Sequence, residues 1–224
     1  MTMTIIFDLD GTLLNTIDDL GYACNYALEH TGYPTHPIAE YPRMVGNGIN
    51  NLIRRALPEA ERTEENILRV RAHFVPYYDV HNCDYTRPYE GMPELLQTLK
   101  AQGHRLAVAS NKYQAATEKI VNHFFPGVFD VILGEREGIE RKPNPQIVYD
   151  ITSQLGLCPS TAHRALNTQP LYLGDSLVDR DTARNANVPF VACSWGFVPK
   201  QQLIAEQITT IIDAPADLLP LIEA

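Results

Sequence analysis

Thr4-Ile-Ile-Phe7, near the start of the sequence, is a short apolar and β-branched run that continues directly into Asp8-Leu9-Asp10. The apolar run favours a buried β-strand that ends where the carboxylates begin. Because side chains alternate along an extended backbone, Asp8 and Asp10 point to one side and Leu9 to the other. A glycine follows, and an Asp-Gly pair is typical of a turn. A plain turn and a site of paired carboxylates are therefore both open interpretations of this stretch.

Further strand-like runs alternate with helical periodicity along most of the remaining chain. The expected strands cover residues 105–109, 130–133, 171–173, 189–192 and 210–212, and the expected helices cover 93–101, 115–124, 145–155, 177–186 and 200–207. The strands are apolar almost throughout, which is typical of parallel strands buried on both faces. The alternation predicts an α/β fold with a Rossmann-like, doubly wound parallel sheet and helices on both faces.

Residues 15–87 interrupt this alternation, since they show helical periodicity only. Helices are expected over Thr16–His30, Asn50–Leu57 and Glu64–Tyr78. An all-helical insertion after the first strand is typical of a second, smaller domain. The sequence thus predicts a small helical domain at 15–87 and a core domain made of 1–14 and 88–224.

The 224 residues carry 27 acidic and 18 basic side chains, so that the formal net charge is −9. Negative charge of this size repels nucleic acid and anionic membrane surfaces, and we expect neither as a partner. The four cysteines are widely spaced, as in a reduced intracellular protein. The sequence shows neither a signal peptide nor an apolar run long enough to span a membrane, so a cytoplasmic monomer or homodimer is expected.

Polar residues follow three of the expected strands where each ends: Asp8 and Asp10, then Ser110 and Asn111, then Asp175. Ligands of open α/β sheets bind outside the carboxyl ends of the strands, so these side chains should meet in one crevice. The acids around Asp175 also fit the capped first turn of a helix. Carboxylates a few ångströms apart repel each other by roughly 4 kcal/mol per pair near a protein surface. A hard divalent cation relieves that repulsion, and Mg²⁺ is the expected cofactor.

Four short motifs, in this order along the chain, resemble those of the haloacid dehalogenase (HAD) superfamily hydrolases. They are Asp8-Leu-Asp-Gly-Thr12, Ser110-Asn-Lys112, Lys142-Pro143 and Gly174-Asp-Ser-Leu-Val-Asp179. The helical insertion resembles the helical cap of that superfamily. Within the insertion, the stretch Val45-Gly-Asn-Gly48 is similar to the sequence found in phosphoglycolate phosphatases. The resemblance implies a magnesium-dependent phosphatase that hydrolyses the phosphomonoester of a small metabolite, phosphoglycolate or a similar compound, through an aspartyl-phosphate.

The resemblance also implies a role for each matching residue. The catalytic residues would be Asp8, the nucleophile, and Asp10, the general acid and base. Mg²⁺ would be bound by Asp8, the Asp10 backbone carbonyl and Asp175, with Asp179 as an auxiliary ligand. The phosphate-binding residues would be Thr12, Ser110, Asn111 and Lys142. Thr12 alternatively caps a helix or contacts Asp10, and Lys142 alternatively is a solvated loop charge. Bound Mg²⁺ and Lys142 would supply the local positive field that an anionic substrate needs in an acidic protein.

Other activities of the superfamily fit the sequence less well or stay open. Dehalogenases lack the second aspartate, which is present here as Asp10, and phosphonate hydrolases use a cap lysine, whereas residues 15–89 contain none. A sugar phosphomutase shares both aspartates and stays open, as does a non-catalytic binding or regulatory protein of the same fold. Arg54 or Arg55 of the predicted cap is a candidate contact for a second anionic group of the substrate.

Two features depart from the family pattern. Residues 157–170 are longer than the loop that normally precedes Gly174-Asp-Ser, which indicates a surface insertion. Asn187 stands where a glycine usually ends the following helix, and asparagine is the common substitute in a left-handed cap.

Overall fold

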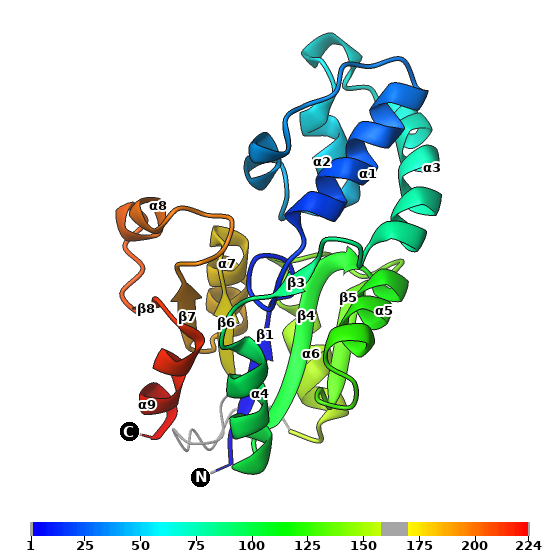
Figure 1. Cartoon of the computed structure of the whole chain (residues 1–224). Helices are drawn as coiled ribbons and strands as arrows, with labels where there is room; N and C mark the ends of the chain where they lie inside the picture. Colours follow the sequence, from blue (N-terminus) through cyan, green and yellow to red (C-terminus); the bar gives the residue numbers. More distant parts are fainter. Residues whose placement is uncertain (1, 158–169, 224) are drawn as a thin grey trace.

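The computed structural model describes residues 2–157 and 170–223 and is built around one six-stranded parallel sheet (Figure 1). In spatial order its strands are β5 (Val131–Glu135), β4 (Arg105–Tyr113), β1 (Thr4–Phe7), β6 (Leu171–Gly174), β7 (Phe190–Cys193) and β8 (Ile211–Ile212). The chain order runs outward in both directions from β1, so the sheet is doubly wound, as the sequence predicts. β1 and β6 flank the switch point, where α/β sheets bind their ligands.

Alternate residues of β1 pack into cores on the two faces of the sheet. Ile5 and Phe7 belong to one buried cluster and Ile6 to the other. Each of these side chains is fully buried, which stabilises the fold by roughly 1.5–3 kcal/mol apiece. The first face is covered by α4 (Met92–Ala101) and α5 (Gln114–Phe124), and the second by α6 (Gln146–Gln154) and α7 (Leu177–Ala186). The short helices α8 (Lys200–Ala205) and α9 (Leu218–Glu223) lie in the C-terminal part.

Residues 15–87, called the helical segment below, lie beyond the carboxyl end of the sheet, at the top of Figure 1. They contain α1 (Ile17–His30), α2 (Ile49–Ala56) and α3 (Glu64–His81), with 3₁₀ turns at Ile38–Arg43 and Glu59–Glu61. α1 and α3 pack side by side. The helices expected from periodicity are confirmed, although α3 continues three residues beyond its predicted end at Tyr78.

The two chain connections between the sheet and the helical segment are tied to each other. β2 (Leu14–Asn15) and β3 (Arg87–Pro88) form a short antiparallel pair where the chain leaves and returns. The carboxylate of Asp19 accepts hydrogen bonds from the backbone of Tyr85 and of Thr86, each at 2.9 Å, and from the Thr86 hydroxyl at 2.7 Å. Bonds to a buried carboxylate are short and strong, so they fix the base of the helical segment.

A few details refine the expected element boundaries. β4 runs beyond its predicted end at Ala109, because Tyr113 pairs with Glu135 after a shift of register. Asn187 ends α7 in the left-handed conformation, with φ of 57°, as predicted. The surface insertion expected at 157–170 lies almost wholly in 158–169, outside the described residues. No helix in the described part of the chain is long and apolar enough to cross a membrane.

Candidate active site

β1 and β6 end beside each other and carry the first carboxylates of the site. Asp8 follows β1 and donates its backbone N–H to Leu173 O at 2.9 Å, and Asp175 follows Gly174 at the end of β6. Carboxylate oxygens of Asp8, Asp175 and Asp179 all lie within 4.8 Å of one another, and the three residues are buried. The carboxyl ends of two neighbouring strands thus bring Asp8 together with Asp175 and Asp179, which lie far from it in the sequence.

Lys142 reaches this group from the loop before α6 and is itself buried. Its Nζ lies 2.8 Å from Asp8 Oδ1 and 2.8 Å from Asp179 Oδ1. It also donates to Ala109 O at 2.8 Å and to the Tyr172 hydroxyl at 3.1 Å. Burial lowers the pKa of Lys142, but the charges of Asp179 and Asp8 outweigh that effect and hold the pKa well above its usual value. Lys142 is therefore a buried, charged ammonium group and not a solvated loop lysine.

The side chain of Asn111 fixes the backbone of Lys142. Its Oδ1 accepts the Lys142 backbone N–H at 2.9 Å, and its Nδ2 donates to Lys142 O at 3.1 Å. The same Nδ2 donates to Gly46 O of the helical segment at 3.2 Å. Beside it, Ser110 Oγ accepts the backbone N–H of Lys112 at 3.1 Å. The end of β4 therefore joins the Lys142 loop to the helical segment.

The carboxylates are held in an environment that disfavours their charged forms. Burial raises the pKa of Asp8 well above its ordinary value, and the charge of Asp179 raises it further, against a lowering effect of Lys142. The pKa of Asp175 rises to about 7, first through burial and then through the charge of Asp179. Three carboxylates with one ammonium group leave an excess of buried negative charge. A divalent cation that prefers oxygen ligands fits this donor set.

Asp179 has a structural role and a place in the site at the same time. Ser176 Oγ accepts the Asp179 backbone N–H at 3.3 Å, and Asp179 Oδ2 accepts the Ser176 backbone N–H at 3.1 Å. This capping box starts α7 and satisfies two of its backbone donors. The other carboxylate oxygen contacts Lys142. The capping interpretation of the fourth motif is confirmed, and it orients a carboxylate of the cluster.

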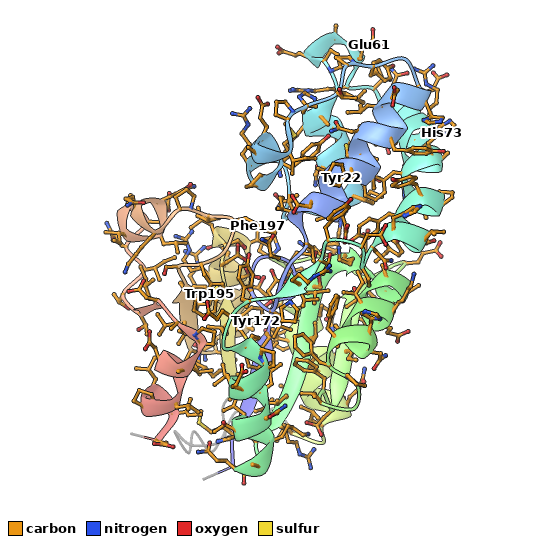
Figure 2. The ribbon with its side chains drawn as sticks, viewed as in Figure 1. Tyr22, Glu61, His73, Tyr172, Trp195 and Phe197 are labelled. Atoms are coloured by element: carbon orange, nitrogen blue, oxygen red, sulfur yellow. The ribbon has the colours of Figure 1, made fainter. Side chains whose placement is uncertain are left out.

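Asp175 is held from two sides by neighbouring loops. Its Oδ2 accepts the backbone N–H of Phe197 at 2.7 Å, and its Oδ1 accepts the Thr12 hydroxyl at 3.2 Å. Two glycines make room for it: a Cβ on Gly11 would lie 2.5 Å from Asp175 Oδ2, and one on Gly196 only 2.2 Å from Asp175 Cβ. Figure 2 shows Phe197 at the end of the sheet that faces the helical segment.

Asp10 is contacted by two residues to which the sequence analysis assigns no role. Thr16 Oγ1 donates to Asp10 Oδ1 at 2.7 Å, and Lys112 Nζ lies 3.0 Å from the same oxygen. The contact with Asp10 suggested as an alternative for Thr12 is instead made by Thr16. Thr16 stands just before α1, where a threonine indicates only the start of a helix. Lys112 lies inside the second motif, and this position is the one feature of the sequence that could have suggested a role for it in the site.

A pocket lies between these residues and the helical segment. From the core it is lined by Asp8, Asp10, Ser110, Asn111, Lys112 and Tyr113. From the helical segment it is lined by Leu20, Val45, Gly46, Gly48, Ile49, Leu52, Phe74 and Tyr78. Thr12, Lys142, Asp175 and Asp179 are buried and are not among the residues that line this pocket.

The two arginines of α2 also do not line the pocket. Arg54 donates to Asn51 Oδ1 at 2.6 Å and lies 3.4 Å from Glu64. Arg55 donates to Met44 O at 2.8 Å and to the side chain of Asn47. Arg55 thus supports the loop that forms part of the pocket wall.

This site and sheet topology match known proteins over almost the whole chain. A family model for haloacid dehalogenase-like hydrolases matches residues 5–193. The phosphoglycolate phosphatase of Mannheimia succiniciproducens is 31% identical over 223 residues, with 96% of each chain covered. That of Aquifex aeolicus is 30% identical and covers 98% of this chain and 96% of its own length. A crystal structure of a predicted phosphoglycolate phosphatase from Haemophilus somnus superposes with a TM-score of 0.84 at 31% identity, covering 98% of this chain and 97% of the other.

The chain belongs to the haloacid dehalogenase-like hydrolases, whose fold and ordered motifs it carries. Within that family it is a phosphatase-type enzyme similar to the phosphoglycolate phosphatases, as its sequence relatives and its structural neighbour agree.

Proposed function

We propose that this chain is a Mg²⁺-dependent phosphatase that hydrolyses a phosphomonoester of a small metabolite through an aspartyl-phosphate on Asp8. The names of its relatives make phosphoglycolate the first substrate to test. The observation that carries the proposal is the buried group of Asp8, Asp175 and Asp179 around Lys142, which reaches a pocket next to Asp10. Phosphoryl transfer needs a nucleophile, a proton donor and positive charge, and a divalent cation bound by these carboxylates would supply that charge together with Lys142.

The oxygen-rich donor set suits Mg²⁺, held by carboxylate oxygens of Asp8 and Asp175 and by the backbone carbonyl of Asp10. When bound, the ion supplies positive charge that stabilises the oxygens of the phosphoryl group in the transition state. Asp179 already accepts from Lys142 and Ser176, which suits an auxiliary position. The Thr12 hydroxyl serves the same site by orienting Asp175.

In the first step a carboxylate oxygen of Asp8 attacks phosphorus. Asp8 Oδ1 accepts the backbone N–H of Leu9 at 2.7 Å and contacts Lys142, which orients the carboxylate. As the Asp8–phosphorus bond forms, the ester bond between phosphorus and the leaving oxygen breaks, and Asp10 gives its proton to that oxygen. The Ser110 hydroxyl, the Asn111 backbone N–H and Lys142 bind the phosphoryl oxygens.

In the second step water attacks the phosphorus of the aspartyl-phosphate. Asp10, now a carboxylate, takes the proton of the attacking water, and the bond between phosphorus and the Asp8 oxygen breaks. Inorganic phosphate leaves, and both aspartates return to their starting protonation states. The Thr16 hydroxyl keeps Asp10 oriented through both proton transfers.

We propose further that residues 15–87 act as a cap domain over a core formed by 1–14 and 88–224. The cap supplies the apolar wall of the pocket, which excludes water from the reacting groups. Its loop at Gly46 is bonded to Asn111, next to the Lys142 backbone. Closure of the cap is therefore coupled to residues that bind the phosphoryl group.

The test is release of inorganic phosphate from p-nitrophenyl phosphate and from phosphoglycolate, with Mg²⁺ and with EDTA. The wild type should release phosphate with Mg²⁺ only, and Asp8→Asn should lower the rate by at least about 1,000-fold. Asp181→Asn is the matched control, because Asp181 lies two residues beyond Asp179 on α7 and pairs with Arg180 and Arg184 at the surface. Full activity of Asp8→Asn would refute the proposal. Isomerisation of a sugar phosphate with little net release would support a phosphomutase instead.

A further inference from the structure

Lys112 is the one cationic side chain among the described residues that line the pocket. Its side chain is only 4% exposed, and it extends from β4 toward the helical segment. The ammonium group lies 3.0 Å from Asp10 Oδ1 and donates to the Tyr78 hydroxyl of α3 at 2.7 Å. A buried cation in the wall of this pocket needs a functional explanation, because most lysines stay solvated.

The surroundings of Lys112 leave room for a ligand. An ammonium group has three N–H donors, and within residues 2–157 and 170–223 its two contacts are with Asp10 and Tyr78. The third donor is available to an acceptor in the pocket. The ring of Tyr78 lies below the ammonium, 4.8 Å from Nζ to the ring centre, which further stabilises the charge there.

Among the residues that the structure describes, the rest of the wall offers no other cation to a second anionic group. The helical segment contributes Leu20, Val45, Ile49, Leu52 and Phe74, all of them apolar, and Tyr78 with its hydroxyl. Arg54 and Arg55 are bonded within the helical segment and are not at the pocket. A polyhydroxylated sugar would leave its hydroxyls against apolar side chains, which costs free energy.

The position of Lys112 beside Asp10 restricts where a charged group of the substrate can lie. In the proposed mechanism Asp10 contacts the ester oxygen of the leaving group, and Lys112 lies 3.0 Å from Asp10. A carboxylate on the carbon bonded to that ester oxygen would lie within a few bonds of the atom that Asp10 contacts, and so within reach of Lys112. We propose that Lys112 binds this carboxylate and selects 2-phosphooxy acids, of which phosphoglycolate is the simplest. This inference rests on the proposed phosphatase function and assigns its specificity to one residue.

The experiment compares kcat/KM for three substrates in two enzymes. The substrates are phosphoglycolate, its neutral amide phosphoglycolamide, and 3-phosphooxypropanoate, in which one methylene separates the carboxylate further from the ester oxygen. The enzymes are the wild type and Lys112→Met. The wild type should have a higher kcat/KM for phosphoglycolate than for either other compound. In Lys112→Met the ratio of kcat/KM for phosphoglycolate to that for the amide should fall by roughly tenfold to a hundredfold, as expected for loss of a hydrogen bond to a charged group.

Two control variants separate charge recognition from general damage. Tyr78→Phe removes one partner of Lys112 but keeps its charge and the aromatic ring, so the preference for the carboxylate should persist. Lys100→Met removes an exposed lysine that pairs with Asp130, and it should leave the substrate ratios unchanged.

An equal loss for phosphoglycolate and its amide in Lys112→Met would overturn the proposal, because it would mean that Lys112 only orients Asp10. A wild type without preference for phosphoglycolate over the amide would overturn it even if the variant did not fold. Both results are distinct from failure of the proposed function, in which the wild type would release no phosphate from these substrates or from p-nitrophenyl phosphate.

Discussion

Lys142 and Asp8 are joined by a buried ion pair of 2.8 Å, although they lie on opposite sides of the helical insertion in the sequence. The pair places a fixed positive charge beside the first carboxylate after β1. It also brings the third motif to the carboxyl end of the central strand. The geometry of the site depends on this contact, since Lys142 holds Asp179 through the same ammonium group.

Replacing this ammonium should therefore destabilise the protein as well as inactivate it. Lys142→Met leaves two buried carboxylates without their counter-ion, and breaking a buried pair costs about 3–5 kcal/mol. Urea unfolding at about pH 8 without Mg²⁺ measures the change in the free energy of unfolding. Lys100→Met, which breaks an exposed pair with Asp130, should cost less than about 1 kcal/mol. Equal losses in the two variants would contradict the assigned role of Lys142.

The raised pKa of Asp175 predicts how stability without metal depends on pH. A carboxyl whose pKa rises on folding stabilises the protein fully below its unfolded pKa of about 4, and this contribution is lost as the pH rises through about 7. The melting temperature in EDTA should therefore fall between about pH 5 and pH 8. In the proposed site Mg²⁺ would bind the deprotonated carboxylates, so it should raise the melting temperature much more at pH 8 than at pH 5.

Asp175→Asn provides the check on this pH dependence. The amide cannot ionise, so the fall of the melting temperature in EDTA should become shallower and the Mg²⁺-induced rise at high pH should largely disappear. Scanning calorimetry at matched pH values measures both. A Mg²⁺-induced rise that is the same in wild type and variant would show that Asp175 does not bind the metal.

Asp10→Asn should affect substrates according to their leaving groups. Loss of a general acid costs about 100- to 10,000-fold where the leaving alcohol needs a proton. p-Nitrophenolate leaves without one, so formation of the phosphoenzyme from p-nitrophenyl phosphate should be spared and only its hydrolysis slowed. Stopped-flow absorbance should then show a burst of about one nitrophenolate per active site, followed by slow turnover. Equal slowing of the burst and of turnover would count against Asp10 as the acid.

Gly196→Ala should displace Asp175, since the added Cβ would lie 2.2 Å from the Asp175 Cβ. A displacement of about 1 Å at a catalytic group can cost roughly 100-fold in rate. The Mg²⁺ concentration for half-maximal activity should rise together with this loss. Gly127→Ala is the comparison, because Gly127 has a positive φ but nothing within 4 Å of an added Cβ, so it tests backbone strain alone. Similar activities in the two variants would argue against this close approach.

The sheet and the order of its helices could be predicted because buried parallel strands leave continuous apolar runs. The pairing of β2 with β3 could not be predicted, because a strand of two residues is too short to show the alternation of apolar and polar side chains. The extension of β4 to Tyr113 was missed because polar residues after Ala109 indicated a strand end, while the pairing with Glu135 depends on a distant segment.

The convergence of Asp8, Asp10 and Asp175 could be predicted because each follows the end of an expected strand, whereas their chemical roles stay predictions. Contacts made by the backbone leave no such signal, and the Phe197 N–H that holds Asp175 is an example. Thr16 and Lys112 meet at Asp10 from segments far apart in the chain, and their individual residue types do not indicate that contact.

The nucleophilic role of Asp8 is tested most directly by trapping the covalent intermediate. Asp10→Asn is mixed with substrate and Mg²⁺, quenched in acid after the first turnover, digested, and analysed by tandem mass spectrometry. We predict that the peptide containing Asp8 gains the mass of one phosphoryl group, located on that residue, and that Asp8→Asn shows no such gain. Phosphate release with Asp8 unmodified throughout, or a phosphoryl group on another residue, would contradict the mechanism.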